Sequence, residues 1–266
     1  MPSSLLIIAL ILGSFLLGSI PFGFLIARLK GIDLRDHGSG NIGATNLGRV
    51  LGRPYFFLCF LLDMSKGLTP TLVAGSMLGT LGQMDIEPSK AWVWLAVMFA
   101  APLGHIFTPW LGFKGGKGVA TGMGALIGVM PAMTIPAAGA AVVFIVIVAL
   151  WRMIGPASAV AAATLPLWTW YSFRQYETLQ ERRIGSQPQF IELPANELHE
   201  MVPFHGTPFL IAATVLAILV IYKHKANLAR TLAGTEPKIG SSNAAQHSPP
   251  QPIPEKTDTP DEIRRD

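Results

Sequence analysis

Long apolar runs separated by short polar segments dominate the chain. The runs cover residues 5–27, 54–81, 92–111, 119–150, 156–171 and 208–222. A membrane-spanning helix needs about 20 apolar residues, so the 119–150 run is too long for one crossing. Pro131 and Pro136 lie inside it, and proline breaks or kinks a helix interior. We expect a short helix at 119–130 and a full one at 135–150. The pattern thus predicts an all-α, polytopic membrane protein with about seven transmembrane helices.

The basic residues between these runs predict the orientation. They fall in the first, third and fifth connecting segments and after the last run: Arg28, Lys30, Arg35, Arg49, Arg53, Lys114, Lys117, Arg152, Lys223, Lys225 and Arg230. Cytoplasmic loops carry an excess of Lys and Arg. Seven crossings with the N-terminus outside place all of these residues, and the C-terminus, in the cytoplasm. The first run lacks a preceding basic region and is too long for a signal-peptide core, so we expect it to be retained.

Composition supports a membrane protein and suggests two regions. The chain is 50% hydrophobic and 14% charged, whereas soluble domains are about 25% charged. The single cysteine, Cys59, excludes a disulfide within the chain and a cysteine metal cluster. We expect a membrane domain at 1–240, with a polar, extended periplasmic segment at 172–205. The 241–266 tail, rich in Ser, Pro, Gln and charge, is expected to be a disordered cytoplasmic tail.

A glycine-rich segment follows the first run, with the sequence H-G-S-G-N-I-G-A-T-N at 37–46. Its glycines allow backbone N–H groups to approach an anion, and its short polar side chains and nearby guanidinium suit a phosphate. The candidates are Gly38, Ser39, Gly40, Asn41, Gly43, Thr45, Asn46 and Arg49. A plain glycine-rich turn would explain the glycines but fits the polar donors less well. A dinucleotide site is disfavoured because a membrane helix, not a strand, precedes the segment.

A second polar segment, F-K-G-G-K-G-V-A-T at 113–121, follows a Gly-His pair at 104–105. Two lysines bracket two glycines just before a helix start, where backbone N–H groups and the positive dipole end favour an anion. The candidates are His105, Lys114, Gly115, Gly116 and Lys117. Lysines that only anchor a helix end at lipid headgroups would leave the paired glycines unexplained. His105 is equally compatible with a core histidine and a ligand.

A third polar segment, Y-K-H-K-A-N-L-A-R at 222–230, follows the last run, and G-T-E-P-K-I-G at 234–240 comes after it. His224 and Asn227 are three residues apart on what should be a continuing helix, so they share a face, and Arg230 lies three further along. Composition alone favours a basic juxtamembrane helix that binds anionic lipid.

Two ionisable residues, Asp63 and Lys66, lie inside the 54–81 run. Such groups are rare within a span and usually pair or serve function. Their spacing allows them to pair with each other, and both interpretations stay open.

Together these segments resemble the signature of the acyl-phosphate-dependent glycerol-3-phosphate acyltransferases. The likeness runs from about Gly18 to Gly240, and the first two segments are distinctive in sequence and order. The resemblance implies a bacterial inner-membrane enzyme with its site facing the cytoplasm. It also implies that acyl phosphate and glycerol-3-phosphate give 1-acyl-glycerol-3-phosphate (lysophosphatidic acid) and phosphate, the first step of phospholipid synthesis. No metal, cofactor or nucleic-acid partner is implied, and the oligomeric state stays open.

The resemblance also implies roles for particular residues. Ser39, His224 and Asn227 would be catalytic, Arg49 and a lysine of the second segment would bind substrate, and Thr45 and the glycines would belong to a phosphate pocket. We add Lys66 and His105 as substrate-binding candidates. The 172–205 segment and the tail are longer than the family pattern.

An acyl phosphate is already activated, so we expect direct attack by the glycerol-3-phosphate hydroxyl, with Ser39 positioning a substrate rather than carrying the acyl group. The base could be His224 or an acyl-phosphate oxygen. The sequence has no H-x-x-x-x-D pair, which disfavours the thioester-using acyltransferases. A transporter for a phosphorylated or anionic metabolite would predict internal repeats and midplane charges, and neither is evident. A lipid-binding scaffold would not need the glycine loops.

Overall fold

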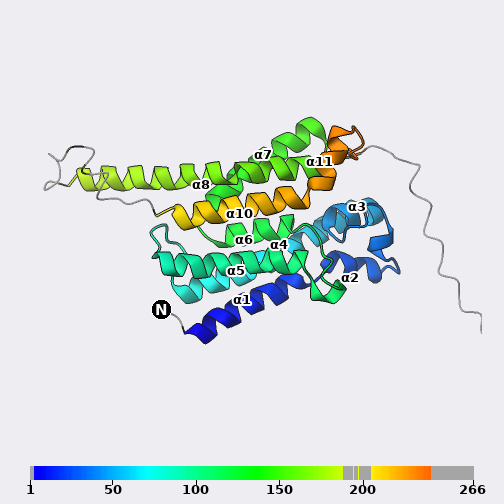
Figure 1. Cartoon of the computed structure of the whole chain (residues 1–266), viewed down its shortest axis with the longest axis horizontal. Coiled ribbons are helices and arrows are strands. Elements are labelled where there is room, and N and C mark those ends of the chain that lie inside the picture. The colour runs from blue at the N-terminus through cyan, green and yellow to red at the C-terminus, as the bar shows by residue number, and fades with distance from the viewer. Residues whose placement is uncertain (1–2, 188–193, 195–196, 198–204, 241–266) are drawn as a thin grey trace, which may run out of the picture.

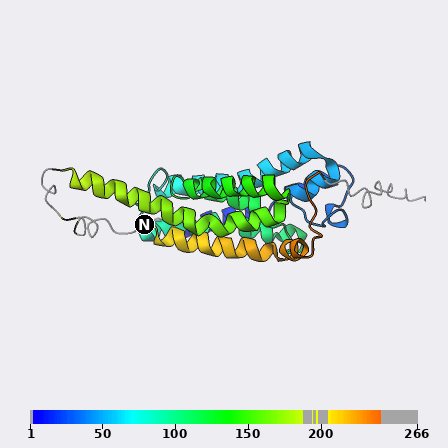
Figure 2. The same ribbon diagram turned by 90° about the horizontal axis from the view of Figure 1, so that it is seen from above.

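The protein is an elongated bundle of helices. A computed structural model describes residues 3–187, 194, 197 and 205–240, and no strand occurs among them. The longer helices lie side by side along the long axis in both ribbon views (Figures 1 and 2). The helices are α1 (Ser4–Ser19), α2 (Phe22–Arg28), α3 (Ala44–Leu51), α4 (Arg53–Leu78), α5 (Pro88–Ile106), α6 (Val119–Gly128), α7 (Thr134–Trp151), α8 (Ile154–Gly185), α10 (Thr207–Lys223) and α11 (Lys225–Leu232), with 3₁₀ turns at Leu34–Asp36 and Pro109–Leu111.

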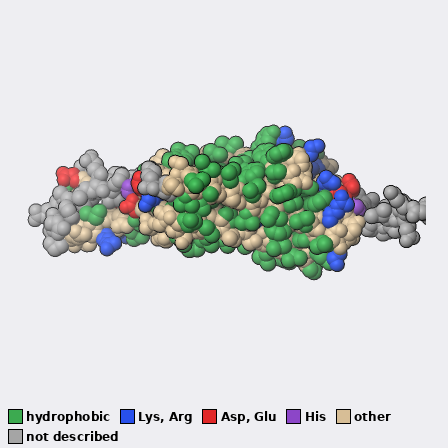
Figure 3. All heavy atoms as spheres, turned by 90° about the horizontal axis from the view of Figure 1, so that it is seen from below, with side chains coloured by type: hydrophobic (Ala, Val, Ile, Leu, Met, Phe, Trp, Pro, Cys, Tyr) green, Lys and Arg blue, Asp and Glu red, His purple; other side chains and the backbone are tan. Residues whose placement is uncertain are grey.

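The surface of the bundle is that of a membrane protein. Apolar side chains cover the middle of the molecule, and charged side chains gather towards its ends (Figure 3). On α7, for example, Val142 and Ile145 are 60% and 64% exposed, and soluble proteins rarely expose large contiguous apolar surfaces. Within the described ranges, four helices are long and apolar enough to cross a membrane, or five if the bent α10–α11 pair is one span. The count of seven crossings and the orientation stay predictions.

Small residues allow the helices to approach closely, as is common where helices pack within lipid. A Cβ atom at Gly67 of α4 would overlap the Thr121 carbonyl of α6, and one at Gly124 of α6 would overlap the Met64 carbonyl of α4. Between α1 and α5, Gly18 lies against Ala101 in the same manner. Trp94 is fully buried and donates from Nε1 to the Thr71 carbonyl at 2.8 Å.

The expected division of the 119–150 run is confirmed. The run forms α6, which ends at Gly128, and α7, which begins at Thr134. Pro131 lies in the turn between them. Pro136 lies in the first turn of α7, where its missing N–H has no helical partner to lose.

The first run is one candidate span, Ser4–Arg28, as expected, but its helix is interrupted. It forms α1 and α2 with a break at Ile20 and Pro21, because proline cannot donate the helical hydrogen bond. Polar groups from elsewhere fill the break. Thr108 donates from Oγ1 to the Ser19 carbonyl at 2.6 Å, and Lys66 donates from Nζ to the Ile20 carbonyl at 2.6 Å.

The polar segment that starts at residue 172 is helical in its first part, because α8 continues to Gly185, and its expected periplasmic position stays a prediction. Neither Gly nor Pro occurs from 167 to 184, and tertiary packing supports the extension. Phe173 stacks on Phe209 of α10 with ring centroids 5.0 Å apart. Within α8, Arg174 pairs with Glu177 three residues along at 2.9 Å. Most of 188–204 and the whole 241–266 tail lie outside the described residues.

The last helix bends where it was expected to continue straight. α10 and α11 meet at His224 with an angle of 57°. The His224 backbone N–H still reaches the Val220 carbonyl at 3.1 Å, and its ring Nδ1 lies 2.8 Å from the same oxygen. The bend turns α11 across one end of the bundle (Figure 1).

Candidate active site

The three polar segments meet at one end of the bundle. The glycine-rich loop before α3, the loop between α5 and α6, and the α10–α11 bend lie at the end where α3 and α11 are labelled (Figure 1). Lys and Arg side chains gather there (Figure 3). Segments that are distant in sequence therefore form one basic surface at the edge of the apolar belt.

A hydrogen-bond network joins the second and third segments. Lys117 donates from Nζ to Oδ1 of Asn227. Asn227 donates from Nδ2 to Oε1 of Glu236 at 2.6 Å, and Arg230 donates from Nε to Oε2 of Glu236 at 2.8 Å. Asn227 and Glu236 are buried, with 7% and 5% of their surface exposed. Glu236 thus fixes both Asn227 and Arg230, and Asn227 fixes Lys117.

Arg49 from α3 joins this network through charge. Glu236 and Arg230 both act electrostatically on Arg49, and Arg49 and Arg230 both act on Lys117. Burial lowers the pKa of Lys117 to about 8, Glu236 opposes that shift, and Arg230 and Arg49 add to it. Three cations and one carboxylate therefore share this surface, and the excess positive charge suits a phosphate.

The buried His224 ring is oriented by a carbonyl of its own helix. It is 2% exposed, and its Nδ1 lies 2.8 Å from the Val220 carbonyl. A carbonyl oxygen only accepts, so Nδ1 must carry the hydrogen. In the neutral ring Nε2 then keeps its lone pair. Both Lys117 and Glu236 act electrostatically on His224, which puts it in the same cluster.

The glycine-rich loop is held from within by Asn46. This buried side chain accepts from the Ser39 backbone N–H at 2.9 Å and donates to the His37 carbonyl at 2.9 Å and the Leu34 carbonyl at 3.3 Å. Gly38 has φ of 60°, and a Cβ there would overlap Asn46 Oδ1. The observed role of Asn46 is to shape the loop, and Ser39 is exposed on it.

Asn41 and Thr45 also lie at the start of α3. Asn41 accepts from the Gly43 N–H at 2.9 Å, and Gly43 caps α3. Thr45 lies in the first turn of that helix and is partly exposed. Gly40 completes the turn with φ of 67°. Whether any of these residues contacts substrate stays a prediction.

The second loop distinguishes its two lysines. Lys114 is exposed, whereas Lys117 is partly buried and reaches Asn227. The Gly115 and Gly116 N–H groups donate to the Ile106 and His105 carbonyls at 3.0 and 3.1 Å. Those two N–H groups therefore hold the loop against the end of α5, and Lys117 is the residue of this loop in the network.

Asp63, Lys66 and His105 lie one layer deeper. Lys66 Nζ is 2.8 Å from Asp63 Oδ1, so the two residues pair with each other. His105 Nδ1 lies 3.6 Å from the same carboxylate oxygen. Direct contact of Lys66 or His105 with substrate stays a prediction.

Glu236 is the residue that sequence reasoning missed. Its carboxylate accepts hydrogen bonds from two residues of the cluster, Asn227 and Arg230. The residues next to it in the sequence did not indicate that it would be buried. The available signal was an acidic residue within an otherwise basic stretch, flanked by Gly234 and Pro237. A lone carboxylate between cations is a natural partner for them.

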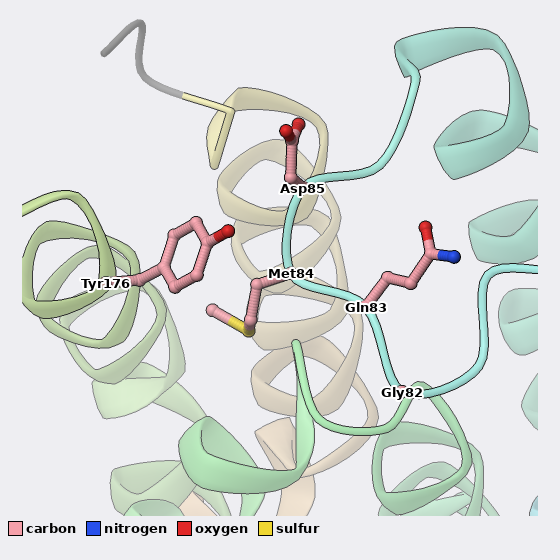
Figure 4. A pocket seen from close by; sticks show the side chains of 5 residues that line it. All are labelled: Gly82, Gln83, Met84, Asp85 and Tyr176. Atoms are coloured by element: carbon pink, nitrogen blue, oxygen red, sulfur yellow. The ribbon is translucent and has the colours of Figure 1, made fainter. Parts of the chain in front are cut away.

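An open hollow of about 390 Å³ lies away from this cluster, towards the other end of the bundle. It is lined by Gly82, Gln83, Met84, Asp85 and Tyr176, and the Tyr176 ring points from α8 towards the 82–85 loop (Figure 4). It contains none of the predicted site residues. In the part of the chain that the structure describes, no group of three or more His, Cys, Asp and Glu residues could hold a metal ion.

Comparison with known proteins identifies the family. A family model described as glycerol-3-phosphate acyltransferase matches residues 8–234. The chain belongs to this family. A glycerol-3-phosphate acyltransferase of Trichlorobacter lovleyi is 41% identical over 229 residues, which cover 86% of this chain and 95% of the relative. One of Thermosynechococcus vestitus is 37% identical, over 91% of this chain and 99% of the relative.

Solved structures of this acyltransferase family share the fold. The glycerol 3-phosphate form of PlsY (YgiH), an integral membrane glycerol 3-phosphate acyltransferase, has a TM-score of 0.68 and 32% identity, and the match covers 91% of this chain and 99% of that one. Its lysophosphatidic acid form has a TM-score of 0.66 and 32% identity, and the match covers 88% of this chain and 95% of that one. This chain is therefore an acyltransferase of the membrane, and a transporter is not favoured.

Proposed function

We propose that this acyltransferase moves an acyl group from an acyl phosphate to the 1-hydroxyl of glycerol-3-phosphate, giving lysophosphatidic acid and inorganic phosphate. The observation that carries the proposal is the convergence of Arg49, Lys117 and Arg230 with His224 and Asn227 at the polar end of an apolar bundle. Two phosphorylated substrates need fixed cations, and a lipid product needs an adjacent apolar phase. The relatives' names and the two ligand forms of PlsY supply the acceptor and the product.

The cations of this cluster would bind phosphate before reaction begins. Arg49 presents a planar fork that matches two phosphate oxygens. Lys117 supplies a point charge held in place by Asn227. Because the network already fixes Lys117, little reorganisation of this cation is needed when negative charge develops on the leaving phosphate.

Transfer needs one nucleophilic step. The 1-hydroxyl oxygen of glycerol-3-phosphate attacks the carbonyl carbon and forms the ester bond. The bond between that carbon and the phosphate oxygen breaks, and phosphate leaves. His224 Nε2 takes the hydroxyl proton and returns it to the departing phosphate. Ser39 on the exposed loop positions a substrate and carries no acyl group, because the donor is already activated.

The acyl phosphate donor rests on the motif resemblance and on the missing H-x-x-x-x-D pair. The setting follows from the basic segments, which the positive-inside rule places in the cytoplasm. We therefore assign the enzyme to the bacterial inner membrane with its site at the cytoplasmic face. The acyl chain can then stay in the apolar phase while the headgroup chemistry takes place at the basic surface.

The test compares donors with purified enzyme in detergent micelles. Palmitoyl phosphate with glycerol-3-phosphate should yield lysophosphatidic acid and phosphate in equal amounts, and palmitoyl-CoA should give a far lower rate. His224→Ala should abolish most turnover, whereas the matched control Lys225→Ala, at an exposed neighbour, should retain it. Equal turnover with palmitoyl-CoA would contradict the donor assignment, and failure of both donors would contradict the acyl transfer itself.

A further inference from the structure

A cluster of ionisable side chains lies beneath the candidate active site. Asp63 and Lys66 of α4 are each 2% exposed, and His105 of α5 is 5% exposed. Asp63 is central, because its carboxylate contacts Lys66 at 2.8 Å, His105 at 3.6 Å and the Cys59 thiol at 3.5 Å. Burying such groups is costly, and in a membrane protein they usually have a task.

On one side the cluster holds the broken first helix. Lys66 Nζ donates to the Ile20 carbonyl at 2.6 Å and lies 5.6 Å from the centre of the Phe22 ring. Ile20 and Phe22 flank Pro21, which lies between the end of α1 and the start of α2. Lys66 therefore fixes the start of α2. α2 in turn lies against the glycine-rich loop, because a Cβ at Gly23 of α2 would overlap the Ile42 carbonyl of that loop.

On the other side the cluster holds the second loop. The His105 carbonyl accepts from the Gly116 N–H at 3.1 Å. A Cβ at Gly116 would overlap ring atom Nε2 of His105, and a Cβ at Gly115 would overlap the His105 carbonyl. Only glycines allow the loop to lie this close to the ring. The next residue, Lys117, reaches across to Asn227.

We propose that Asp63, Lys66 and His105 form a buried polar brace that positions Lys117 and the start of α2 for acyl transfer. The proposal makes these three side chains positioning residues, in place of the substrate contact expected for Lys66 and His105 from the sequence. Asp63 pairs with Lys66 and lies 3.6 Å from the His105 ring, so the α1–α2 break and the second loop meet at one carboxylate. The pairing of glycines with lysines in the second segment then has a structural reason: the glycines pack against the ring, and Lys117 projects from them.

The brace should affect the rate more than the fold. A displacement of about 1 Å at a catalytic group can cost about 100-fold in rate, and Lys117 is one residue from the glycine that lies on His105. If the brace acts through Lys117, removing the brace should change the kinetics in the same way as removing Lys117. Residues that act as one unit are strongly non-additive in their effects on kinetics.

The experiment is a double-mutant cycle on the purified full-length enzyme. His105→Leu and Lys117→Met are measured singly and together for kcat and for KM of each substrate. We expect His105→Leu to lower kcat by about 10- to 100-fold and to change KM in the same sense as Lys117→Met. The double variant should be no slower than Lys117→Met alone, because the His105 side of the brace acts only through that lysine. The control Ser65→Ala, at an exposed position of α4 next to Lys66, should behave as wild type.

A role in folding alone gives different results. Unchanged kcat in His105→Leu, or effects that multiply in the double variant, would overturn the proposal. If His105→Leu does not fold, Asp63→Asn with Lys66→Met removes the charge pair without leaving one charge buried alone, and the cycle is repeated with it. Loss of folded protein in that variant too would place the brace in the fold and contradict the proposal. The inference rests on the proposed acyl transfer, but the cycle works with whichever donor the wild-type enzyme accepts, so failure of the donor assignment would be seen separately.

Discussion

Replacing Glu236 should disable the site although this residue has no predicted contact with substrate. It accepts two hydrogen bonds, from Asn227 at 2.6 Å and from Arg230 at 2.8 Å. A hydrogen bond to a charged group contributes about 1.5–3 kcal/mol, and a neutral one about 1 kcal/mol. Glu236→Gln keeps the shape but loses the charge, and its amide can accept from only one partner.

The expected cost follows from these contacts. The two charged bonds are replaced by one neutral bond, and the Arg230 side chain is 41% exposed, so water compensates part of its loss. We expect a net cost of about 2 kcal/mol. If this cost mainly destabilises the transition state, kcat/KM drops by about 30-fold, because each 1.4 kcal/mol changes a rate constant about tenfold. Glu236→Ala loses both hydrogen bonds and should lower kcat/KM further than Glu236→Gln does.

The assay measures kcat/KM for glycerol-3-phosphate at saturating acyl donor, together with thermal unfolding in detergent. Glu236→Gln should lose activity while it remains folded, and Glu236→Ala should also unfold at a lower temperature. Pairing Glu236→Gln with Asn227→Ala should add little to Asn227→Ala alone. Wild-type kcat/KM in Glu236→Ala would refute the reasoning, because Asn227 and Lys117 would then not depend on this carboxylate.

Three further predictions concern charge and orientation. Arg49→Lys should raise KM for one phosphorylated substrate by at least about tenfold, because an ammonium replaces the bidentate fork; unchanged steady-state kinetics would remove Arg49 from the site. Since burial lowers the pKa of Lys117 to about 8, its charge is present below that pH and lost above it. KM for glycerol-3-phosphate should rise above about pH 8 and stay flat in Lys117→Arg; the same rise in the arginine variant would assign the titration elsewhere. Reporter fusions after Leu81 and Arg230 should read outside and inside, respectively, and any other pattern would contradict the seven-span topology.

The sequence predicted the parts of the fold that depend on local patterns. Apolar runs of spanning length became helices, and the 119–150 run divided into α6 and α7 at the turn that contains Pro131. The break in the first run at Pro21 was not predicted, although proline interrupts a helix there for the same reason. The long α8 was underestimated because its last turns are polar, and their packing, such as Phe173 on Phe209, involves a helix far along the chain.

The sequence predicted where the candidate site lies better than it predicted which of its side chains form hydrogen bonds with one another. Clustering of basic residues on one side indicated that three segments would meet, since membrane topology brings alternate loops together. Which lysine of the second loop would reach Asn227 depended on packing of Gly115 and Gly116 against His105, which spacing alone does not reveal. Glu236 was missed for a similar reason, because its burial arises only when the chain after α11 folds back onto Asn227 and Arg230.

The central claim is that the 1-hydroxyl oxygen of glycerol-3-phosphate attacks the acyl carbonyl carbon and becomes the ester oxygen of the product. Glycerol-3-phosphate carrying ¹⁸O in its 1-hydroxyl, incubated with unlabelled acyl phosphate and the purified enzyme, tests it in one mass measurement of both products. The account predicts that the label is found in the ester oxygen of lysophosphatidic acid and that the released phosphate is unlabelled. Label in the released phosphate, or an acyl ester linked through an unlabelled oxygen, would contradict it.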